Sequence, residues 1–336
     1  MPTQLNQAGT KSPTTSEKAL RQEAAPIQSS PWQLATDLLR SARPKQWTKN
    51  LIVFAPILFA AKIFEPQPFL ATATSAVAFC LVSSAVYLLN DVLDREQDRI
   101  HPRKKNRPIA AGRVSPTVAL TTALIASILG LFLAVQIKPS CGVLVLAYWA
   151  VMLGYANFLK HVVLVDIMIV ASGFVIRAVA GGVAAGVPLS GWFLLCTSFG
   201  ALFLALEKRR HELNTLAVTA QDHRTVLEDY STGLIDRIES IVVSGLLNCY
   251  IFYSFLSYHG QWMMVTVPFV FYGVIRYQLL SKQAALTGAP EDVLLKDRPT
   301  QITIVLWLLT SAAVLYNVIP GGIGHFFQWL DQVSWR

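Results

Sequence analysis

Residues 90–98, with the sequence NDVLDREQD, close a long apolar run, and the basic sequence HPRKKNRP follows at 101–108. On an α-helix of about 3.6 residues per turn, Asp91, Asp94 and Asp98 fall within roughly a third of the circumference. Carboxylates so close repel one another, which favours a bound cation. Hard oxygen ligands without an adjacent His or Cys point to Mg²⁺, which usually holds a phosphorylated substrate. A solvated helix end is the alternative, but it explains neither the apolar lead-in nor the basic sequel.

The composition of the 336-residue chain is that of a membrane protein. Hydrophobic residues make up 53% of it and charged residues only 14%, against roughly 25% in soluble domains. Apolar runs long enough to cross a bilayer recur along the chain, and Pro268 is expected to kink the eighth of them. We therefore predict an all-α polytopic membrane bundle of about nine transmembrane helices. The predicted spans are 50–64, 68–90, 114–136, 139–158, 162–186, 190–206, 238–258, 261–281 and 300–320.

Two segments precede these spans. Residues 1–30 are rich in Ser, Thr, Gln, Ala and Pro without an apolar block, so a disordered cytoplasmic tail is expected there. Residues 31–47 interleave Trp and Leu with Arg and Lys, a pattern typical of a helix that lies in the headgroup region. Residues 31–336 are therefore predicted to form a single transmembrane domain that begins with this interfacial helix.

The basic residues are distributed unevenly between the two ends of the predicted spans. Of the 28 Lys and Arg residues, only Lys62, Lys138 and Arg336 fall on one side, and Arg177 lies within a span. By the positive-inside rule the other side is cytoplasmic. This predicts a multi-pass protein of the inner (plasma) membrane, with its amino terminus and active site in the cytoplasm and its carboxyl terminus outside. The net charge of +8 follows from this bias, and no aromatic-and-basic pattern indicates nucleic acid, so that partner is excluded.

Small residues in the predicted spans indicate close packing. The four cysteines lack metal-ligand spacing and are expected to be apolar packing residues. Gly181, Gly182 and Gly186 are expected to let helices approach closely.

Polar side chains gather at the cytoplasmic ends of the predicted spans. Lys45 and Lys49 either anchor a helix at the headgroups or bind phosphate, and the run KRR at 208–210 is either a topology signal or a phosphate site. A charge within a span costs several kcal/mol unless it is paired or hydrated. Asp166 and Arg177 therefore indicate either a structural ion pair or a water-filled cavity. Together the polar segments predict a cytoplasm-facing central cavity with a metal on one wall and cations opposite, which suits a donor that carries a diphosphate.

Asn90 and Asp91, followed by Asp94 and Asp98, resemble the first aspartate-rich motif of the UbiA superfamily of intramembrane prenyltransferases. The resemblance covers nearly the whole membrane region and implies nine transmembrane helices, magnesium and a cytosol-facing cavity. Prenyl-transferring members usually carry a second Asp-x-x-x-Asp cluster after the sixth span. Here the corresponding loop begins EKRRHE at 207–212, and such a basic loop is better matched to an extra phosphate on the donor.

The run RPKQWTKN at 43–50, the stretch 90–113, and Tyr230, Ser231 and Asp236 resemble a narrower branch of that superfamily. This branch transfers a 5-phosphoribosyl group from phosphoribosyl diphosphate (PRPP) to decaprenyl (polyprenyl) phosphate, for lipid-linked arabinose in the cell wall. The attacking lipid phosphate is already an anion, so no general base is required, and stabilising the departing diphosphate is the main task. The sequence agrees, since it offers no convincing Ser-His-Asp or Cys-His set.

The expected site residues follow from this resemblance and from their charge. Asp91, Asp94 and Asp98 are the expected catalytic residues, and with Asn90 they are the expected Mg²⁺ ligands. The expected substrate-binding residues are Lys45, Gln46, Lys49, Asn50, Arg103, Lys104, Arg107, Lys160, Lys208, Arg209, Arg210, Glu212, Tyr230 and Asp236. Two other functions stay open: a UbiA-type prenyltransferase with a prenyl diphosphate donor and an aromatic or other acceptor, and a transporter or lipid-binding membrane protein. A homo-oligomer also stays open.

Overall fold

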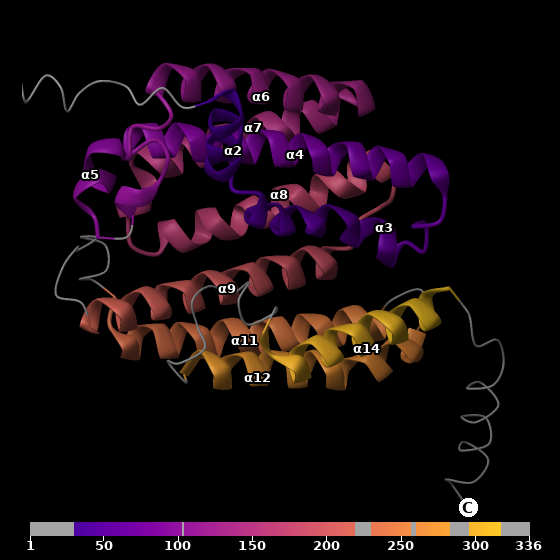
Figure 1. Cartoon of the computed structure of the whole chain (residues 1–336). Helices are drawn as coiled ribbons and strands as arrows, with labels where there is room; N and C mark the ends of the chain where they lie inside the picture. The colour runs from indigo at the N-terminus through magenta and orange to yellow at the C-terminus, as the bar shows by residue number, and fades with distance from the viewer. Residues whose placement is uncertain (1–29, 103, 219–229, 257–259, 283–295, 317–336) are drawn as a thin grey trace, which may run out of the picture.

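The computed structural model describes residues 30–102, 104–218, 230–256, 260–282 and 296–316, and every regular element in them is a helix (Figure 1). This confirms the predicted all-α class. Eight helices within the described residues are long and apolar enough to cross a membrane: α4, α6, α7, α8, α9, α11, α14 and the continuous pair η4 and α12. The elements in chain order are α2 (Pro31–Ala42), η1 (Pro44–Phe54), α3 (Ala55–Phe59), α4 (Pro66–Leu93), α5 (Arg95–Ile100), η2 (Lys104–Asn106), α6 (Pro116–Ile137), α7 (Pro139–Asn157), η3 (Leu159–His161), α8 (Val165–Ala185), α9 (Gly191–Val218), α11 (Thr232–Leu256), η4 (Gly260–Thr266), α12 (Val267–Lys282) and α14 (Arg298–Leu315).

Several of these helices begin at a proline. Pro66, Pro116 and Pro139 occupy the first turns of α4, α6 and α7. Proline fits there because its missing N–H would have no partner within the helix and its φ is already helical. Ser115 completes the start of α6, where its hydroxyl accepts a hydrogen bond from the backbone N–H of Val118.

The first predicted span, 50–64, is not a single helix. The 3-10 helix η1 runs to Phe54, and the α-helix that follows, α3, has only five residues. Pro56 has no N–H for an α-helical bond and its ring would clash with the carbonyl four residues earlier, so a new helix starts with Pro56 in its first turn. Ala61, just beyond α3, has a φ of 55° and turns the chain. Of the nine predicted spans, eight therefore correspond to candidate spans among the described residues, and 50–64 packs as two short helices against α4 and α8.

The eighth predicted span, 261–281, changes helix type at one point. η4 is a 3-10 helix through Thr266, and α12 starts at Val267 with Pro268 in its first turn. The break expected at Pro268 is therefore present as the junction between these two helices.

The helices form two groups that meet at α8 and α9 (Figure 1). The elements from α2 to α8 make up one group, and α9, α11, α12 and α14, coloured from red to yellow, make up the other. Phe79 and Tyr148 belong to the core of the first group, and Phe203 and Leu206 to the core of the second. Ile167 of α8 also packs in the second core, so the contact between α8 and α9 joins the two groups.

Gly181 lets η1 lie directly against α8. A Cβ at this position would be 2.0 Å from the carbonyl oxygen of Val53 in η1. Gly182 has no room either, because its Cβ would lie 2.8 Å from Leu189 Cγ. The Gly181 contact confirms the predicted close approach of two helices, whereas Leu189 lies in the loop that follows α8. Gly186 has a different role, since it ends α8 in the left-handed conformation with a φ of 68°.

The helix predicted over 31–47 is present as α2 but is shorter. Ser30 caps its first turn through a reciprocal side-chain and backbone arrangement, the capping box. α2 ends before the predicted limit because Arg43 is left-handed and Pro44 opens η1. Its place in the headgroup region stays a prediction, and the predicted tail, 1–30, lies outside the described residues except for Ser30.

Candidate active site

The acidic run lies where α4 ends and α5 begins. Asp91 is in the last turn of α4, Asp94 is the junction between the helices, and Asp98 is in α5. Asp91 and Asp98 are only 2% and 3% exposed. A buried carboxylate needs a charged or hydrogen-bonding partner. Basic side chains from two other segments supply these partners, and a third segment supplies a partner for Asp94.

Arg107 contacts two of the predicted metal ligands. Its Nη1 lies 3.1 Å from Asp91 Oδ1 and 2.6 Å from Asp98 Oδ2. One guanidinium nitrogen reaches both only if the two carboxylates converge on a single point. Arg107 comes from the basic run that follows α5 in the sequence, so the acidic and basic runs fold back on each other.

Arg43, at the junction of α2 and η1, also contacts Asp91. Its Nη2 is 2.5 Å from Asp91 Oδ1, and its guanidinium carbon lies 4.8 Å from the centre of the Tyr87 ring, a cation–π contact. Sequence reasoning selected four later residues of the run 43–50 and missed Arg43. The signal that was available is its place at the start of that run, directly before Pro44.

Lys160 and Asn90 hold Asp94. Lys160 Nζ is 3.1 Å from Asp94 Oδ1, and the Asn90 amide donates to Asp94 Oδ2 over 2.9 Å. Lys160 comes from η3, between α7 and α8. Three cations from three segments therefore meet the three carboxylates of the acidic run.

The four predicted ligands carry the donor atoms that Mg²⁺ prefers, which are carboxylate and amide oxygens. Their partners in this structure are cations, and no group of three or more His, Cys, Asp or Glu side chains in the described ranges is arranged to hold a metal ion. A metal bound by these side chains would therefore compete with Arg43, Arg107 and Lys160 for the carboxylates. The sequence predicted a cavity with the metal on one wall and the cations opposite. In the structure the cations instead form direct ion pairs with the predicted metal ligands.

Arg209 belongs to a buried network that joins α8 and α9. It is 2% exposed, its Nε lies 2.7 Å from Asp166 Oδ2, and its Nη1 contacts Glu212. The Tyr230 hydroxyl donates to the other Asp166 oxygen over 2.8 Å. Burial raises the pKa of Tyr230 to about 12, so this hydroxyl stays protonated near pH 7. Asp166 is therefore paired with Arg209 and not with Arg177.

Arg210 is the centre of a second buried network. Its guanidinium contacts Glu207 at 3.3 Å, Asp236 at 2.6 Å and Glu239. The Ser281 hydroxyl of α12 donates to Glu207, so the network ties α9 to α11 and α12. Sequence reasoning missed Glu239 and did not select Glu207, whose spacing of three residues from Arg210 was the available signal. Arg209 and Arg210 are thus both paired with carboxylates of neighbouring helices, Arg209 with α8 and Arg210 with α11.

Arg177 is 5% exposed within α8, and in the described part of the chain its hydrogen-bond partners are neutral. Its guanidinium donates to Asn50 Oδ1 over 2.6 Å, to the Tyr148 hydroxyl over 2.7 Å and to the Gly173 carbonyl over 2.8 Å. The Asn50 amide in turn donates to Cys80 Sγ over 3.1 Å. Asn50, expected from the sequence to contact phosphate, is thus engaged by a buried arginine.

The remaining predicted ligands differ in their exposure. Arg103 lies outside the described residues. The exposed ones are Lys45, Lys104 and Lys208, and the half-buried ones are Gln46 and Lys49.

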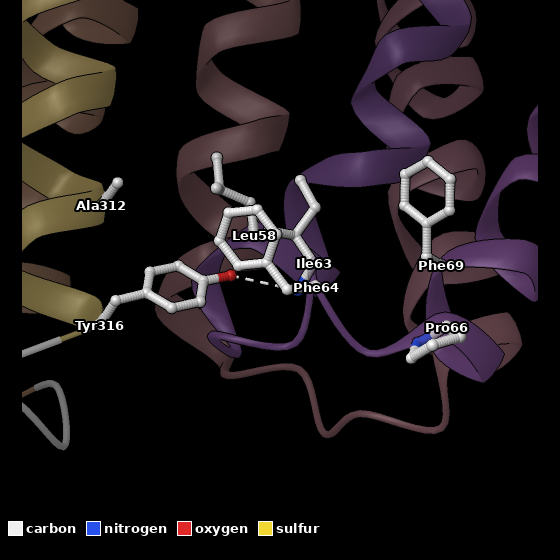
Figure 2. Close-up of a pocket in the computed structure, with 7 residues that line it drawn as sticks. All are labelled: Leu58, Ile63, Phe64, Pro66, Phe69, Ala312 and Tyr316. Atoms are coloured by element: carbon white, nitrogen blue, oxygen red, sulfur yellow. Dashed lines mark hydrogen bonds between the residues drawn. The ribbon is translucent and has the colours of Figure 1, made fainter.

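An apolar cavity of about 570 Å³ lies at the opposite end of α4 from the acidic run (Figure 2). Figure 2 shows Pro66 and Phe69 on one side and Tyr316, of the segment after α14, on the other, with Phe64 between them and its ring against that of Tyr316. The Tyr316 hydroxyl accepts a hydrogen bond from the backbone N–H of Ile63 over 3.1 Å. None of the residues that line this cavity is charged, so it is not the predicted metal-bearing cavity.

Comparison with known proteins agrees with this fold. Residues 50–289 match the model of the UbiA prenyltransferase family, and the chain therefore belongs to this family. A UbiA homolog from Archaeoglobus fulgidus, solved bound to DMAPP and Mg²⁺, has a TM-score of 0.66 over 83% of this chain and 99% of that chain. At 16% sequence identity this likeness shows a shared fold.

Curated relatives extend over nearly the whole chain. The decaprenyl-phosphate phosphoribosyltransferase of Mycolicibacterium smegmatis is 36% identical over 313 residues, which cover 88% of this chain and 98% of that protein. The protein of the same name from Mycobacterium tuberculosis is 37% identical over 292 residues, which cover 85% of this chain and 96% of the relative.

Proposed function

We propose that this protein is a membrane-bound pentosyltransferase that moves a 5-phosphoribosyl group from PRPP to decaprenyl phosphate or a similar polyprenyl phosphate. The observation that carries this proposal is the likeness to relatives named for that reaction, at 36–37% identity over 85–88% of the chain. The acidic run supports it, because carboxylates and cations from four segments converge at one end of the membrane bundle. Such a site suits a diphosphate-bearing donor.

In this proposal the acidic run holds the donor's diphosphate through Mg²⁺. Asn90, Asp91, Asp94 and Asp98 are the proposed ligands, and the metal, when bound, neutralises charge on the departing group. Arg107 Nη1 lies where two of the acids converge, 2.6 Å from the carboxylate of Asp98. It is therefore placed to donate charge-assisted hydrogen bonds to diphosphate oxygens. We propose the same role for Lys160, which lies 3.1 Å from the carboxylate of Asp94.

The proposed reaction breaks the bond between ribose C1 and the diphosphate oxygen, which leaves with the electron pair. A new bond forms between C1 and an oxygen of the lipid phosphate. Positive charge develops on the ribose as the first bond breaks, as in glycoside cleavage. The lipid phosphate is an anion at neutral pH and needs no base, so the work of the site is electrostatic.

The other predicted cations divide into two groups. The buried networks of Arg209 and Arg210 are proposed to hold the helices around the site together, because their donors already face carboxylates. The exposed Lys45, Lys104 and Lys208 are proposed to meet the 5-phosphate or the acceptor phosphate. We also propose that the end of the bundle with the acidic run faces the cytoplasm, in the plasma membrane, because the basic residues concentrate there.

The test is a turnover assay with the purified protein in detergent or lipid. Radiolabelled PRPP, decaprenyl phosphate and Mg²⁺ are incubated with it, and the organic extract is examined for a labelled lipid. Omission of Mg²⁺ or of the lipid phosphate should abolish the product. The family also contains enzymes that use a prenyl diphosphate, so a parallel reaction receives labelled geranyl diphosphate and an aromatic acceptor. Product from this second reaction alone would refute the phosphoribosyl transfer.

Asp91→Asn tests the assignment of the acidic run. The variant should lose at least about a hundredfold in turnover, because an amide replaces a carboxylate ligand and removes one negative charge from the metal site. Glu96→Asn is the matched control, since Glu96 is on the same segment with 74% of its side chain exposed. It should keep turnover within about twofold. Near-normal turnover in Asp91→Asn, with the fold intact, would show that the metal is not held here.

A further inference from the structure

We infer that Arg43 is a donor-binding residue with two alternative partners, the Asp91 carboxylate that it contacts in this structure and the diphosphate of the donor. This inference rests on the proposed function, because it takes the diphosphate to bind at the acidic run. It adds a residue from a segment 48 positions away in the sequence.

The backbone at Arg43 is strained. Its φ of 55° and ψ of 62° lie in the left-handed region, which disfavours every residue with a side chain. The next residue is Pro44, whose ring pushes the preceding residue towards extended conformations. Glycine would be the unstrained choice for this junction, so the arginine side chain has a use that offsets the strain.

Two hydrogen bonds with α4 hold the strained junction in place. The Ser84 hydroxyl donates to the carbonyl of Ala42 over 3.1 Å, and the indole N–H of Trp47 donates to Ser84 Oγ over 3.0 Å. The backbone is thus fixed on both sides of Arg43, and the guanidinium is directed over Tyr87 towards the acidic run. The Arg43 side chain is 28% exposed, so a solute can reach it.

Asp91 can release Arg43 without losing its charge compensation. Its Oδ1 is shared between two guanidinium groups, those of Arg43 at 2.5 Å and Arg107 at 3.1 Å. When one of them leaves, the other remains, so the cost of an unpaired buried carboxylate is avoided. Arg107 is also bound to Asp98, whereas Arg43 has no second carboxylate among the described residues. Arg43 is therefore the cation that exchanges most easily.

The charges at the acidic run explain why the exchange accompanies ligand binding. Three carboxylates contact three cations there, which leaves the cluster balanced. Mg²⁺ alone would bring positive charge next to these cations, and diphosphate alone would bring negative charge next to the carboxylates. If the metal takes the carboxylate and Arg43 takes a phosphate oxygen, both additions are compensated at once. Arg43 therefore opposes the metal alone and favours the donor.

Arg43→Met tests both inferred contacts of Arg43, the one with Asp91 and the one with the donor's diphosphate. Ligand binding is measured by titration calorimetry on the full-length protein. With Mg²⁺ alone as the probe, the variant should bind about threefold or more tightly than the wild type, because Asp91 has lost a competing cation. With PRPP as the probe at saturating Mg²⁺, the variant should bind about tenfold or more weakly, because a charge-assisted hydrogen bond to phosphate is lost. A purely structural role predicts weaker binding of both probes.

Two further variants complete the experiment. Arg40→Met makes the same change of charge in the last turn of α2, where the side chain is 73% exposed, and both affinities should stay within about twofold. Arg43→Gly removes the side chain together with the strain, so it should show the same opposite changes in affinity without loss of thermal stability. Unchanged affinities in both Arg43 variants, or a parallel loss of both, would overturn the inference.

Failure of the proposed function is separable from failure of this inference. Inorganic diphosphate serves as a third probe, because it carries the group that Arg43 is inferred to bind and no ribose. Weaker diphosphate binding in Arg43→Met, with no PRPP turnover in the wild type, would retain Arg43 as a diphosphate ligand while the phosphoribosyl donor is rejected. Diphosphate binding as tight as in the wild type would refute the role of Arg43 whatever the donor is.

Discussion

Gly181→Ala should push η1 away from α8 and so displace the segment that begins with Pro44. The new Cβ would lie 2.0 Å from the carbonyl oxygen of Val53 and 2.8 Å from its carbonyl carbon, whereas carbon atoms in contact sit roughly 3.5–4.0 Å apart. The obstacle is backbone, so no side-chain rotation relieves it and a helix has to move. Overpacking of this kind costs about 1–3 kcal/mol and sometimes more. Alanine gains only about 1 kcal/mol over glycine within a helix, so we expect a net loss of up to about 2 kcal/mol.

Thermal unfolding in detergent, followed by titration with PRPP and Mg²⁺, measures both consequences of Gly181→Ala. Gly200→Ala is the matched control, because Gly200 is also inside a helix and the nearest atom to its new Cβ is Leu246 Cδ1 at 3.9 Å. The control should be more stable than the wild type, by up to about 1 kcal/mol, with unchanged donor binding. If Gly181→Ala were as stable as the control and bound the donor equally well, the close contact between η1 and α8 would be wrong.

Two further predictions concern ion pairs. Asp166→Asn should lower the free energy of unfolding by about 1.5–3 kcal/mol, because it removes one of the two carboxylates that contact the buried guanidinium of Arg209, whereas Glu96→Gln, in an exposed pair, should change it by less than about 1 kcal/mol. Chemical denaturation in detergent measures both, and equal effects would contradict the buried network. The guanidinium of Arg276, at 2.7 and 2.8 Å, holds the pKa of Asp297 well below its usual range, so this pair stabilises the protein above roughly pH 4 and loses that contribution as the pH falls. Asp297→Asn should flatten the acid side of a plot of melting temperature against pH, and an unchanged curve would argue against the pair.

Much of the fold could be predicted from the sequence because apolar composition dominates it. Runs of about 20 apolar residues define helices that cross a bilayer, whatever their neighbours are. The region 50–64 shows where this reasoning stops, since hydropathy counts Pro56 as one residue among many while its missing N–H starts a new helix. The division into two groups that meet at α8 and α9 was not predicted either. It depends on packing between segments that no periodicity in the sequence connects.

The charged residues of the candidate site could be predicted from the sequence, but the ion pairs between them could not. The acidic run and the basic residues at the same end of the bundle follow from charge and hydropathy alone. Which cation meets which acid does not, because Arg209 finds Asp166 across 43 positions and Arg43 finds Asp91 across 48. A helical spacing such as that of Glu207 and Arg210 is the kind of pairing that a sequence can show. The structure places two of the predicted phosphate ligands, Arg209 and Arg210, in buried networks, and their binding of phosphate stays a prediction.

The buried guanidinium of Arg177 limits how this region of the protein can vary during evolution. Asn50 and Tyr148 accept hydrogen bonds from this cation among apolar helices, and so replace the water that would solvate it at the protein surface. An apolar residue at 177 would leave the amide and the hydroxyl unsolvated, and an apolar residue at 50 or 148 would leave the cation partly bare. These three positions are therefore expected to be inherited as a set, and a lineage that loses the arginine should lose the other two polar groups with it.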